Sequence, residues 1–130
     1  MTARILIVED EDSILLSLEF LLTEAGYAVA TARDGAAALR ALEAQTPDLV
    51  LLDVMLPLID GFELCRRIRA SPRLRCTRIM MLTARGRETE VDRGMALGAD
   101  AYVTKPFSTR ELMDSIRALL ADDATGKTPD

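Results

Sequence analysis

The sequence predicts an α/β three-layer sandwich in which a five-stranded parallel sheet is flanked by five helices. Apolar runs of strand length alternate with longer segments whose apolar residues recur at helical spacing, and this alternation is typical of repeated βα units. The 130 residues, 49% of them apolar, are enough for one domain with a single core.

The predicted strands are five short apolar runs, and those in the middle are apolar enough to be covered by helices on both faces. They are Arg4–Val8, Ala28–Ala32, Asp48–Leu52, Arg78–Leu82 and Ala101–Val103.

The predicted helices occupy about residues 12–25, 34–46, 61–71, 88–97 and 108–120. The first is followed by Gly26, where a left-handed C-terminal cap is expected. The second begins at the N-cap Asp34 and cannot continue through Pro47. These boundary residues agree with the apolar spacing.

The last two helices differ in expected strength. The fourth carries Gly94 in its interior, which costs about 1 kcal/mol relative to Ala, so we expect it to be the least stable helix. The fifth opens with the capping box Ser108-Thr-Arg-Glu111 and buries Leu112, Ile116 and Leu119. Residues 121–130 are polar without apolar spacing and are predicted to be a disordered tail or the start of a linker.

Composition excludes several classes of function. With 16 Lys and Arg against 21 Asp and Glu, the net charge of −5 argues against direct binding to nucleic acid. The chain has no His, which excludes imidazole catalysis and serine triads. Cys65 and Cys76 have neither disulfide nor zinc spacing, and no apolar run is long enough to span a membrane, so a cytoplasmic location is expected.

Side chains that can do chemistry stand at the predicted carboxyl ends of four strands. These are Glu9 and Asp10 after the first strand, Asp53 after the third, Thr83 after the fourth and Lys105 after the fifth. Ligands of open parallel sheets bind beyond these ends, where the strand order reverses. With the order 2-1-3-4-5, the three carboxylates would converge at that point.

Three neighbouring carboxylates repel one another unless a cation neutralises them. A site made only of oxygen ligands favours Mg²⁺, and the lack of His and Cys ligands disfavours zinc. Lys105 and the Thr83 hydroxyl complete a set that would stabilise phosphoryl oxygens while Asp53 attacks phosphorus. Taken singly, each signal has an ordinary structural explanation, since acids are common at helix N-termini. Their occurrence together at four strand ends along one edge of the sheet favours a functional site.

At these residues the chain resembles the receiver domain of two-component response regulators, which has the flavodoxin-like fold. The resemblance covers about residues 4–120 and rests on four motifs in the same order: ILIVEDE at 5–11, LLDVMLP at 51–57 followed by Asp60-Gly61, MLTA at 81–84 and GADAYVTKPF at 98–107. It implies a receiver domain over residues 1–120.

The resemblance implies a role for each matching residue. Asp53 would accept a phosphoryl group from a sensor histidine kinase or a histidine phosphotransfer protein. Asp10, Asp53 and the Met55 carbonyl would bind Mg²⁺, and Glu9 would act through a metal-bound water. Lys105 would pair with the phosphoryl group, and its bond to Pro106 would be cis, which is inexpensive only before proline.

Thr83 and Tyr102 match the switch pair of the family. The resemblance implies that the Thr83 hydroxyl moves to the phosphoryl group and that Tyr102 turns into the vacated space. Phosphorylation can shift such an equilibrium only through its different interaction with the two states. We hypothesise that the weak fourth helix is the element that repacks.

Output would pass through the face of the fourth helix, fifth strand and fifth helix. In relatives that dimerise through this face, charged residues make the contacts, but this chain has Val91 and Ser115 at two of those positions.

Two other functions would use part of the same residue pattern. A Mg²⁺-dependent phosphatase that forms an aspartyl phosphate would share the nucleophile, but it usually needs a second acid where Met55 stands. A pseudo-receiver that binds partners without phosphorylation would not need the complete set of site residues. The expectation is therefore a signalling domain that catalyses only its own phosphorylation and dephosphorylation and is not an enzyme acting on a metabolite.

The run of six Arg between residues 66 and 78, with no acid, has two interpretations. Such charge runs usually form a solvated face. The alternative is a docking patch for an acidic partner.

Overall fold

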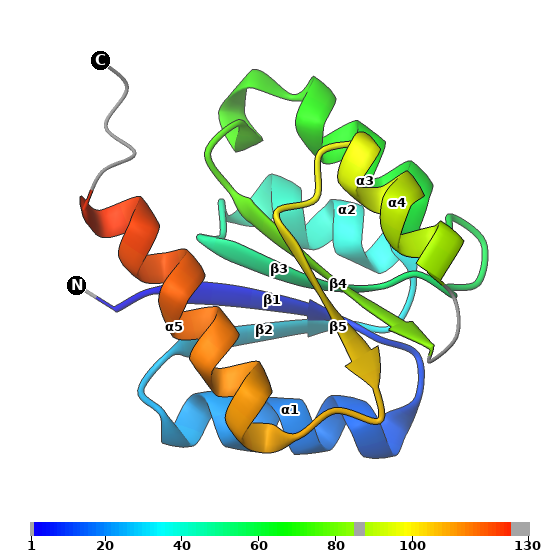
Figure 1. The fold of residues 1–130 in the computed structure, drawn as a ribbon. Coiled ribbons are helices and arrows are strands. Elements are labelled where there is room, and N and C mark those ends of the chain that lie inside the picture. Colours follow the sequence, from blue (N-terminus) through cyan, green and yellow to red (C-terminus); the bar gives the residue numbers. More distant parts are fainter. Residues whose placement is uncertain (1, 85–87, 126–130) are drawn as a thin grey trace.

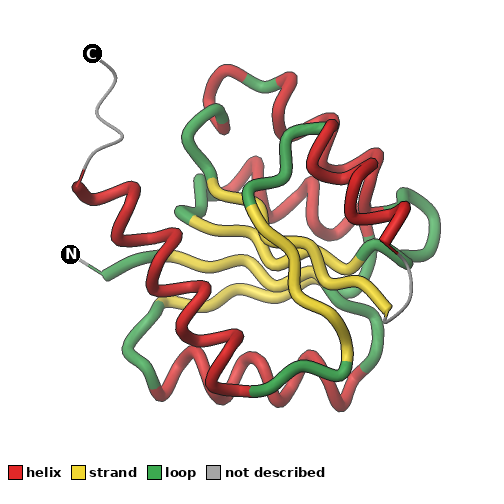
Figure 2. The backbone as a smooth tube through the Cα atoms, viewed as in Figure 1, coloured by secondary structure: helices red, strands yellow, loops and turns green. Residues whose placement is uncertain are grey.

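The computed structural model describes residues 2–84 and 88–125 and contains one five-stranded parallel sheet. The strands are β1 (Arg4–Val8), β2 (Ala28–Ala32), β3 (Leu49–Asp53), β4 (Arg78–Ala84) and β5 (Ala101–Lys105). They are arranged in the order β2-β1-β3-β4-β5, as predicted. Figure 2 shows the strands as a central layer with helices on both sides.

The helices confirm the predicted alternation. They are α1 (Asp12–Glu24), α2 (Gly35–Ala44), α3 (Gly61–Ala70), α4 (Glu88–Ala96) and α5 (Thr109–Thr125), and a short 3₁₀ turn, Pro72–Leu74, follows α3. Helices α1 and α5 cover one face of the sheet, and α2, α3 and α4 cover the other (Figure 1).

Two apolar cores lie on the two faces of the sheet. Ile5 and Ile7 of β1 pack against α1 and α5, whereas Leu6 and Val8 pack toward α2 and α3. Successive side chains of a strand point to opposite faces, so a central strand must be apolar at every position. Accordingly, every residue of β3 is buried.

The predicted caps are present at the helix ends. The Asp34 carboxylate accepts the Ala37 N–H at 2.8 Å, and the Ser108 hydroxyl accepts the Glu111 N–H at 3.2 Å. Gly26 and Gly98 end α1 and α4 with φ of 98° and 113°, a backbone region that is costly for residues with a Cβ. These local signals therefore set the helix boundaries as expected.

Three strands differ from the prediction in their bounds. β4 and β5 each continue two residues farther, because Thr83 pairs with Thr104 and Ala84 with Lys105 in the ladder. β3 is displaced by one residue and includes Asp53, because Asp53 is in register with Leu82. Asp53, Thr83 and Lys105 thus stand within the last pairs of the sheet, whereas Glu9 and Asp10 follow the end of β1.

The predicted tail begins too early. Helix α5 continues through residues 121–125, which were expected to be disordered or linker, and residues 126–130 lie outside the described part of the chain. Leu112 and Ile116 are fully buried, and Leu119 is only half-buried. Hydrogen bonds within the helix continue beyond the last buried turn, so the end of the apolar spacing does not mark the end of the helix.

None of the helices in the described ranges is long and apolar enough to span a bilayer.

Candidate functional site

The carboxyl ends of the strands bring the predicted acids together. β1 and β3 are neighbours, and their last paired residues are Val8 and Leu52, so Glu9 and Asp53 leave the ladder side by side. One carboxylate oxygen from each of Glu9, Asp10 and Asp53 lies within 4.8 Å of the others. Glu9 and Asp53 are buried and Asp10 is exposed, so the cluster faces solvent on one side.

Lys105, at the carboxyl end of the edge strand β5, completes this cluster. Its Nζ lies 2.8 Å from Glu9 Oε1 and 3.1 Å from Asp53 Oδ2. Burial alone lowers the pKa of Lys105, but the Glu9 and Asp53 carboxylates outweigh that effect and raise the pKa above its ordinary value. The lysine is therefore a cation at neutral pH. Its bond to Pro106 is cis, as predicted.

Glu9 is the most deeply buried acid of the cluster. Burial raises its pKa, the neighbouring Asp53 charge raises it further, and hydrogen bonds from Lys105 and from the Glu11 N–H act in the opposite direction. Glu9 Oε2 accepts the Glu11 N–H at 3.1 Å, and the buried Oε1 lies 2.8 Å from Lys105 Nζ and accepts from no other described residue. A carboxylate oxygen has two lone pairs, so Oε1 can also accept from a cation-bound water or contact a cation.

Asp53 is held by both of its oxygens. Oδ1 accepts the Met55 N–H at 3.0 Å, and Oδ2 faces Lys105. The Met55 N–H thus orients the carboxylate from the following loop. That the Met55 carbonyl binds a metal stays a prediction. Gly61, at the start of α3, is in the sequence both a helix boundary and part of the Asp60-Gly61 motif. A Cβ at this position would lie 2.5 Å from the Asp53 carbonyl oxygen, so the helix packs directly on the residue that carries the carboxylate.

The predicted switch pair lies at the ends of β4 and β5. Thr83 is buried, with 3% of its surface exposed, whereas Tyr102 is 49% exposed and therefore points outward. Both residues line a small hollow beneath α4, together with Glu90, Val91 and Met95. The Thr83 hydroxyl lies 3.4 Å from Glu90 Oε1. Sequence reasoning missed Glu90, because only the packing of α4 brings it to Thr83.

The arginine run is mostly engaged within the chain. Arg69 donates to the Gly98 and Thr77 carbonyls at 2.9 and 2.7 Å and to Asp100 at 2.8 Å. Arg73 donates to the Leu42 carbonyl at 2.6 Å.

The remaining contacts of the run follow the same pattern. Arg66 and Arg67 pair with Glu63, and Arg78 lies 3.7 Å from Asp100. These contacts give most of the arginines a role within the fold, and docking of an acidic partner by the run stays a prediction.

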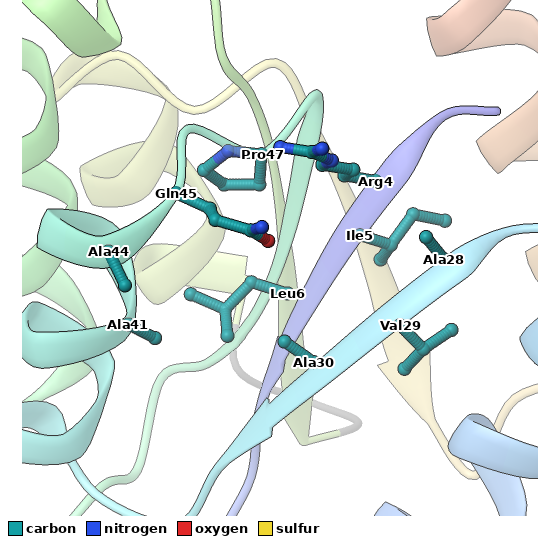
Figure 3. Close-up of a pocket in the computed structure, with 10 residues that line it drawn as sticks. All are labelled: Arg4, Ile5, Leu6, Ala28, Val29, Ala30, Ala41, Ala44, Gln45 and Pro47. Atoms are coloured by element: carbon teal, nitrogen blue, oxygen red, sulfur yellow. The ribbon is translucent and has the colours of Figure 1, made fainter. Parts of the chain in front are cut away.

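A cavity of about 360 Å³ lies at the amino ends of β1 and β2, opposite the strand ends that carry the acidic cluster. Figure 3 shows it between α2 and the edge of the sheet, with small side chains such as Ala30 and Ala41 on its walls. Alanine leaves space where a larger side chain would fill the layer. This cavity shares no residue with the acidic cluster.

The chain matches one family along most of its length and is similar to two transcriptional regulators. Residues 5–117 match the family described as the response regulator receiver domain. The chain is 46% identical over 120 residues to the alkaline phosphatase synthesis transcriptional regulatory protein PhoP of Bacillus subtilis, covering 92% of this chain and 49% of that protein. It is 48% identical over 120 residues to the phosphate regulon transcriptional regulatory protein PhoB of Rhizobium meliloti, covering 92% and 53%. The chain thus spans about half the length of these relatives.

A solved structure is similar over nearly the whole chain. It is the receiver domain of a sensor histidine kinase from Pseudomonas aeruginosa, described with a magnesium ion coordinated in its active site cleft. The TM-score is 0.85 at 32% sequence identity, and the match covers 93% of this chain and 99% of that one.

Proposed function

Because the chain belongs to the response regulator receiver family, we propose that Asp53 accepts a phosphoryl group and that this modification controls an output. The donor would be a phosphohistidine on a sensor kinase or a phosphotransfer protein. The observation that carries the proposal is the position of Lys105, whose ammonium contacts both Asp53 and Glu9.

The geometry supports the following transfer. An Asp53 carboxylate oxygen attacks phosphorus, the bond from phosphorus to the donor imidazole nitrogen breaks, and the imidazole leaves with the electron pair. The product is an acyl phosphate on Asp53. Lys105 stands 3.1 Å from Asp53 Oδ2 and offsets the added negative charge, while the Met55 N–H keeps the carboxylate oriented.

The residues present fit a magnesium ion. All candidate ligands are oxygens, one of them the buried Glu9 Oε1, and the three carboxylates are close enough to share one cation. Asp10, Asp53 and the Met55 carbonyl would hold the ion, and Glu9 would act through a bound water. When bound, Mg²⁺ would neutralise the acids and the incoming phosphoryl oxygens. Lys105 supplies one positive charge against three negative ones, so a divalent ion would bring the cluster to neutrality.

The output is a further part of the proposal. The two relatives named above are transcriptional regulators about twice as long as the matched segment. We place the contact with an output domain or a downstream protein on the face of α4, β5 and α5, where Tyr102 is exposed. The chain itself would bind no nucleic acid, would act in the cytoplasm and would catalyse only its own phosphorylation and dephosphorylation.

Phosphorylation with a small-molecule donor tests this function. The 130-residue chain is incubated with acetyl phosphate and Mg²⁺, and the intact mass is measured. One phosphoryl adduct is expected on the wild type and none on Asp53→Asn. Asp34→Asn is the matched control and should react like the wild type, because Asn caps a helix as well as Asp does.

The other outcomes of this experiment identify the alternatives. A wild type that gains no adduct would indicate a pseudo-receiver. Release of phosphate from added phosphoesters in large molar excess over protein would indicate a phosphatase. An Asp53→Asn variant that is modified as fast as the wild type would refute the assignment of the acceptor.

A further inference from the structure

The Glu90 carboxylate lies within hydrogen-bond distance of the Thr83 hydroxyl. Thr83 Oγ1 lies 3.4 Å from Glu90 Oε1 and 3.5 Å from the Ala84 carbonyl oxygen. A threonine hydroxyl has one proton and donates to one acceptor at a time. A carboxylate is the stronger acceptor of the two. The Thr83 proton is therefore directed toward α4, and no hydrogen bond to Asp53 is formed in the described part of the chain.

The position of Glu90 depends on how α4 packs against β4 and α3. Glu90 lies in the first turn of α4, and Gly94, one turn later, packs so closely on Met81 of β4 that a Cβ would lie 2.4 Å from its sulfur. Arg93 stacks on the Phe62 ring of α3 at 4.2 Å. The contact between Glu90 and Thr83 therefore exists only while α4 keeps this place.

We propose that Glu90 is a positioning residue that restrains Thr83 in the unphosphorylated protein. This inference rests on the proposed function, because it assigns the Thr83 hydroxyl to the phosphoryl group in the modified state. The phosphoryl oxygens and the Glu90 carboxylate then compete for one proton. Whatever stabilises the bond to Glu90 raises the free energy of reaching the phosphorylated arrangement and lowers the apparent affinity for a phosphoryl group. Glu90 thereby sets the threshold of the switch.

A stable phosphoryl mimic measures this restraint. Beryllium fluoride with Mg²⁺ is titrated into the full chain, and binding is followed through the backbone amide resonances of Thr83 and Tyr102. Glu90→Ala removes the acceptor and is expected to bind the mimic about three- to tenfold more tightly than the wild type. Glu90→Gln keeps an acceptor oxygen and should remain closer to the wild type than to Glu90→Ala.

A double-mutant cycle shows whether the effect passes through Thr83. Glu90 makes a further interaction besides this one, and its charge also lies near the site, so the single variant does not isolate the hydroxyl. In the Thr83→Ala background, Glu90→Ala should give no further gain in affinity. Asp92→Ala, an exposed acid on the same helix, is the matched control and should bind the mimic like the wild type.

Three results would overturn the inference. They are an unchanged affinity in Glu90→Ala, an equal gain in Glu90→Ala and Glu90→Gln, and a full gain that persists in the Thr83→Ala background. In each of these cases a wild type that binds the mimic and is modified on Asp53 leaves the proposed function intact. If the wild type neither binds the mimic nor accepts a phosphoryl group, the proposed function fails and this inference fails with it. Urea unfolding of each variant verifies that the domain is folded, and the α4 amide resonances verify the helix.

Discussion

Leu58 combines an unfavourable backbone conformation with an exposed apolar side chain. It lies between β3 and α3 with φ of 70°, and 84% of its surface is exposed. The left-handed region costs residues with a Cβ about 1–2 kcal/mol, and Asn tolerates it better than Leu. Little packing offsets this cost at Leu58, so the loop beside Asp53 stores strain.

We therefore expect Leu58→Asn to raise the free energy of unfolding by about 0.5–1 kcal/mol. Urea denaturation of the two proteins measures the difference. Met55→Asn is the control, because Met55 is also exposed in this loop but has an ordinary φ, and it should give no gain. Equal stability of Leu58→Asn and wild type would show that the loop relaxes without cost.

Glu63 is held as an anion by two arginines. Hydrogen bonds from Arg66 and then Arg67 lower its pKa from the ordinary 4.5 to about 2. The unfolded chain takes up this proton first as the pH falls, so the stabilisation is complete above about pH 4.5 and is lost toward pH 2. Glu63→Gln should therefore lose less stability than the wild type over this pH range.

Thermal unfolding between pH 2 and pH 6 checks this expectation. Glu43→Gln, which changes an exposed acid on α2, is the control and should retain the pH dependence of the wild type. Identical pH profiles for Glu63→Gln and wild type would mean that the two arginines do not hold the carboxylate in solution.

Most site residues could be predicted at the scale of single side chains, because their chemistry is unusual for strand ends. Glu9, Asp53 and Lys105 are charged residues beside apolar runs, and the sheet order makes them neighbours. Glu90 could not be predicted in this way. Its distance from Thr83 depends on the side of α4 that faces the sheet, and an acid in the first turn of a helix is commonplace.

The junction of β3 and α3 is an element-scale constraint on the site. At Gly61 a Cβ would lie 2.5 Å from the Asp53 carbonyl oxygen and 2.8 Å from the Val54 Cα, and both of these atoms belong to the backbone. Neither can move without displacing the end of the strand. At Gly94 the corresponding neighbour is the Met81 sulfur, which belongs to a flexible side chain.

Gly61→Ala should therefore destabilise the protein by about 1–3 kcal/mol and slow the phosphorylation of Asp53. Gly94→Ala should cost less, because the gain in helix propensity offsets part of the overpacking. Urea unfolding and the rate of modification by acetyl phosphate give the two measurements. A Gly61→Ala variant that is modified at the rate of the wild type would show that α3 does not position the acceptor.

Helix α4 is the element whose movement would release Thr83. It is nine residues long, contains Gly94 and makes close contacts with β4 and α3. We expect the amides of α4 to show phosphorylation-dependent exchange on the microsecond to millisecond timescale, detected by relaxation dispersion. Dispersion profiles that do not change with phosphorylation would exclude α4 as the element that repacks.

The elements themselves were largely predictable, and their ends were less so. Apolar spacing located every strand and helix, because burial against the sheet determines which residues must be apolar. The ends of β4 and α5 were missed because backbone hydrogen bonding continues where the apolar pattern has stopped. Thr83 therefore belongs to β4, and residues 121–125 belong to α5, through backbone hydrogen bonds and not through apolar burial.

For the whole molecule, the balance of charge at the acidic edge links metal binding to stability. Three acids face one lysine, so a bound divalent ion should stabilise the folded state by mass action. At ten times its Kd the gain is about 1.4 kcal/mol, which corresponds to a rise in Tm of roughly 5 °C.

Calorimetry in MgCl₂ and in EDTA measures this gain. Asp10→Asn removes an exposed ligand and one repulsive charge, so it should raise Tm in EDTA and reduce the response to Mg²⁺. Asp34→Asn should respond to Mg²⁺ like the wild type. A full Mg²⁺ response in Asp10→Asn would place the ion elsewhere.

The site is assembled from stretches that are far apart in the chain, with Glu9 near its beginning and Lys105 on the last strand. A nascent polypeptide leaving the ribosome therefore has its nucleophile long before it has the ammonium that offsets the new charge. Until β5 has emerged and joined the sheet, the growing chain should not accept a phosphoryl group from a donor. The ability to accept a phosphoryl group would then show that synthesis and folding have passed the fifth strand.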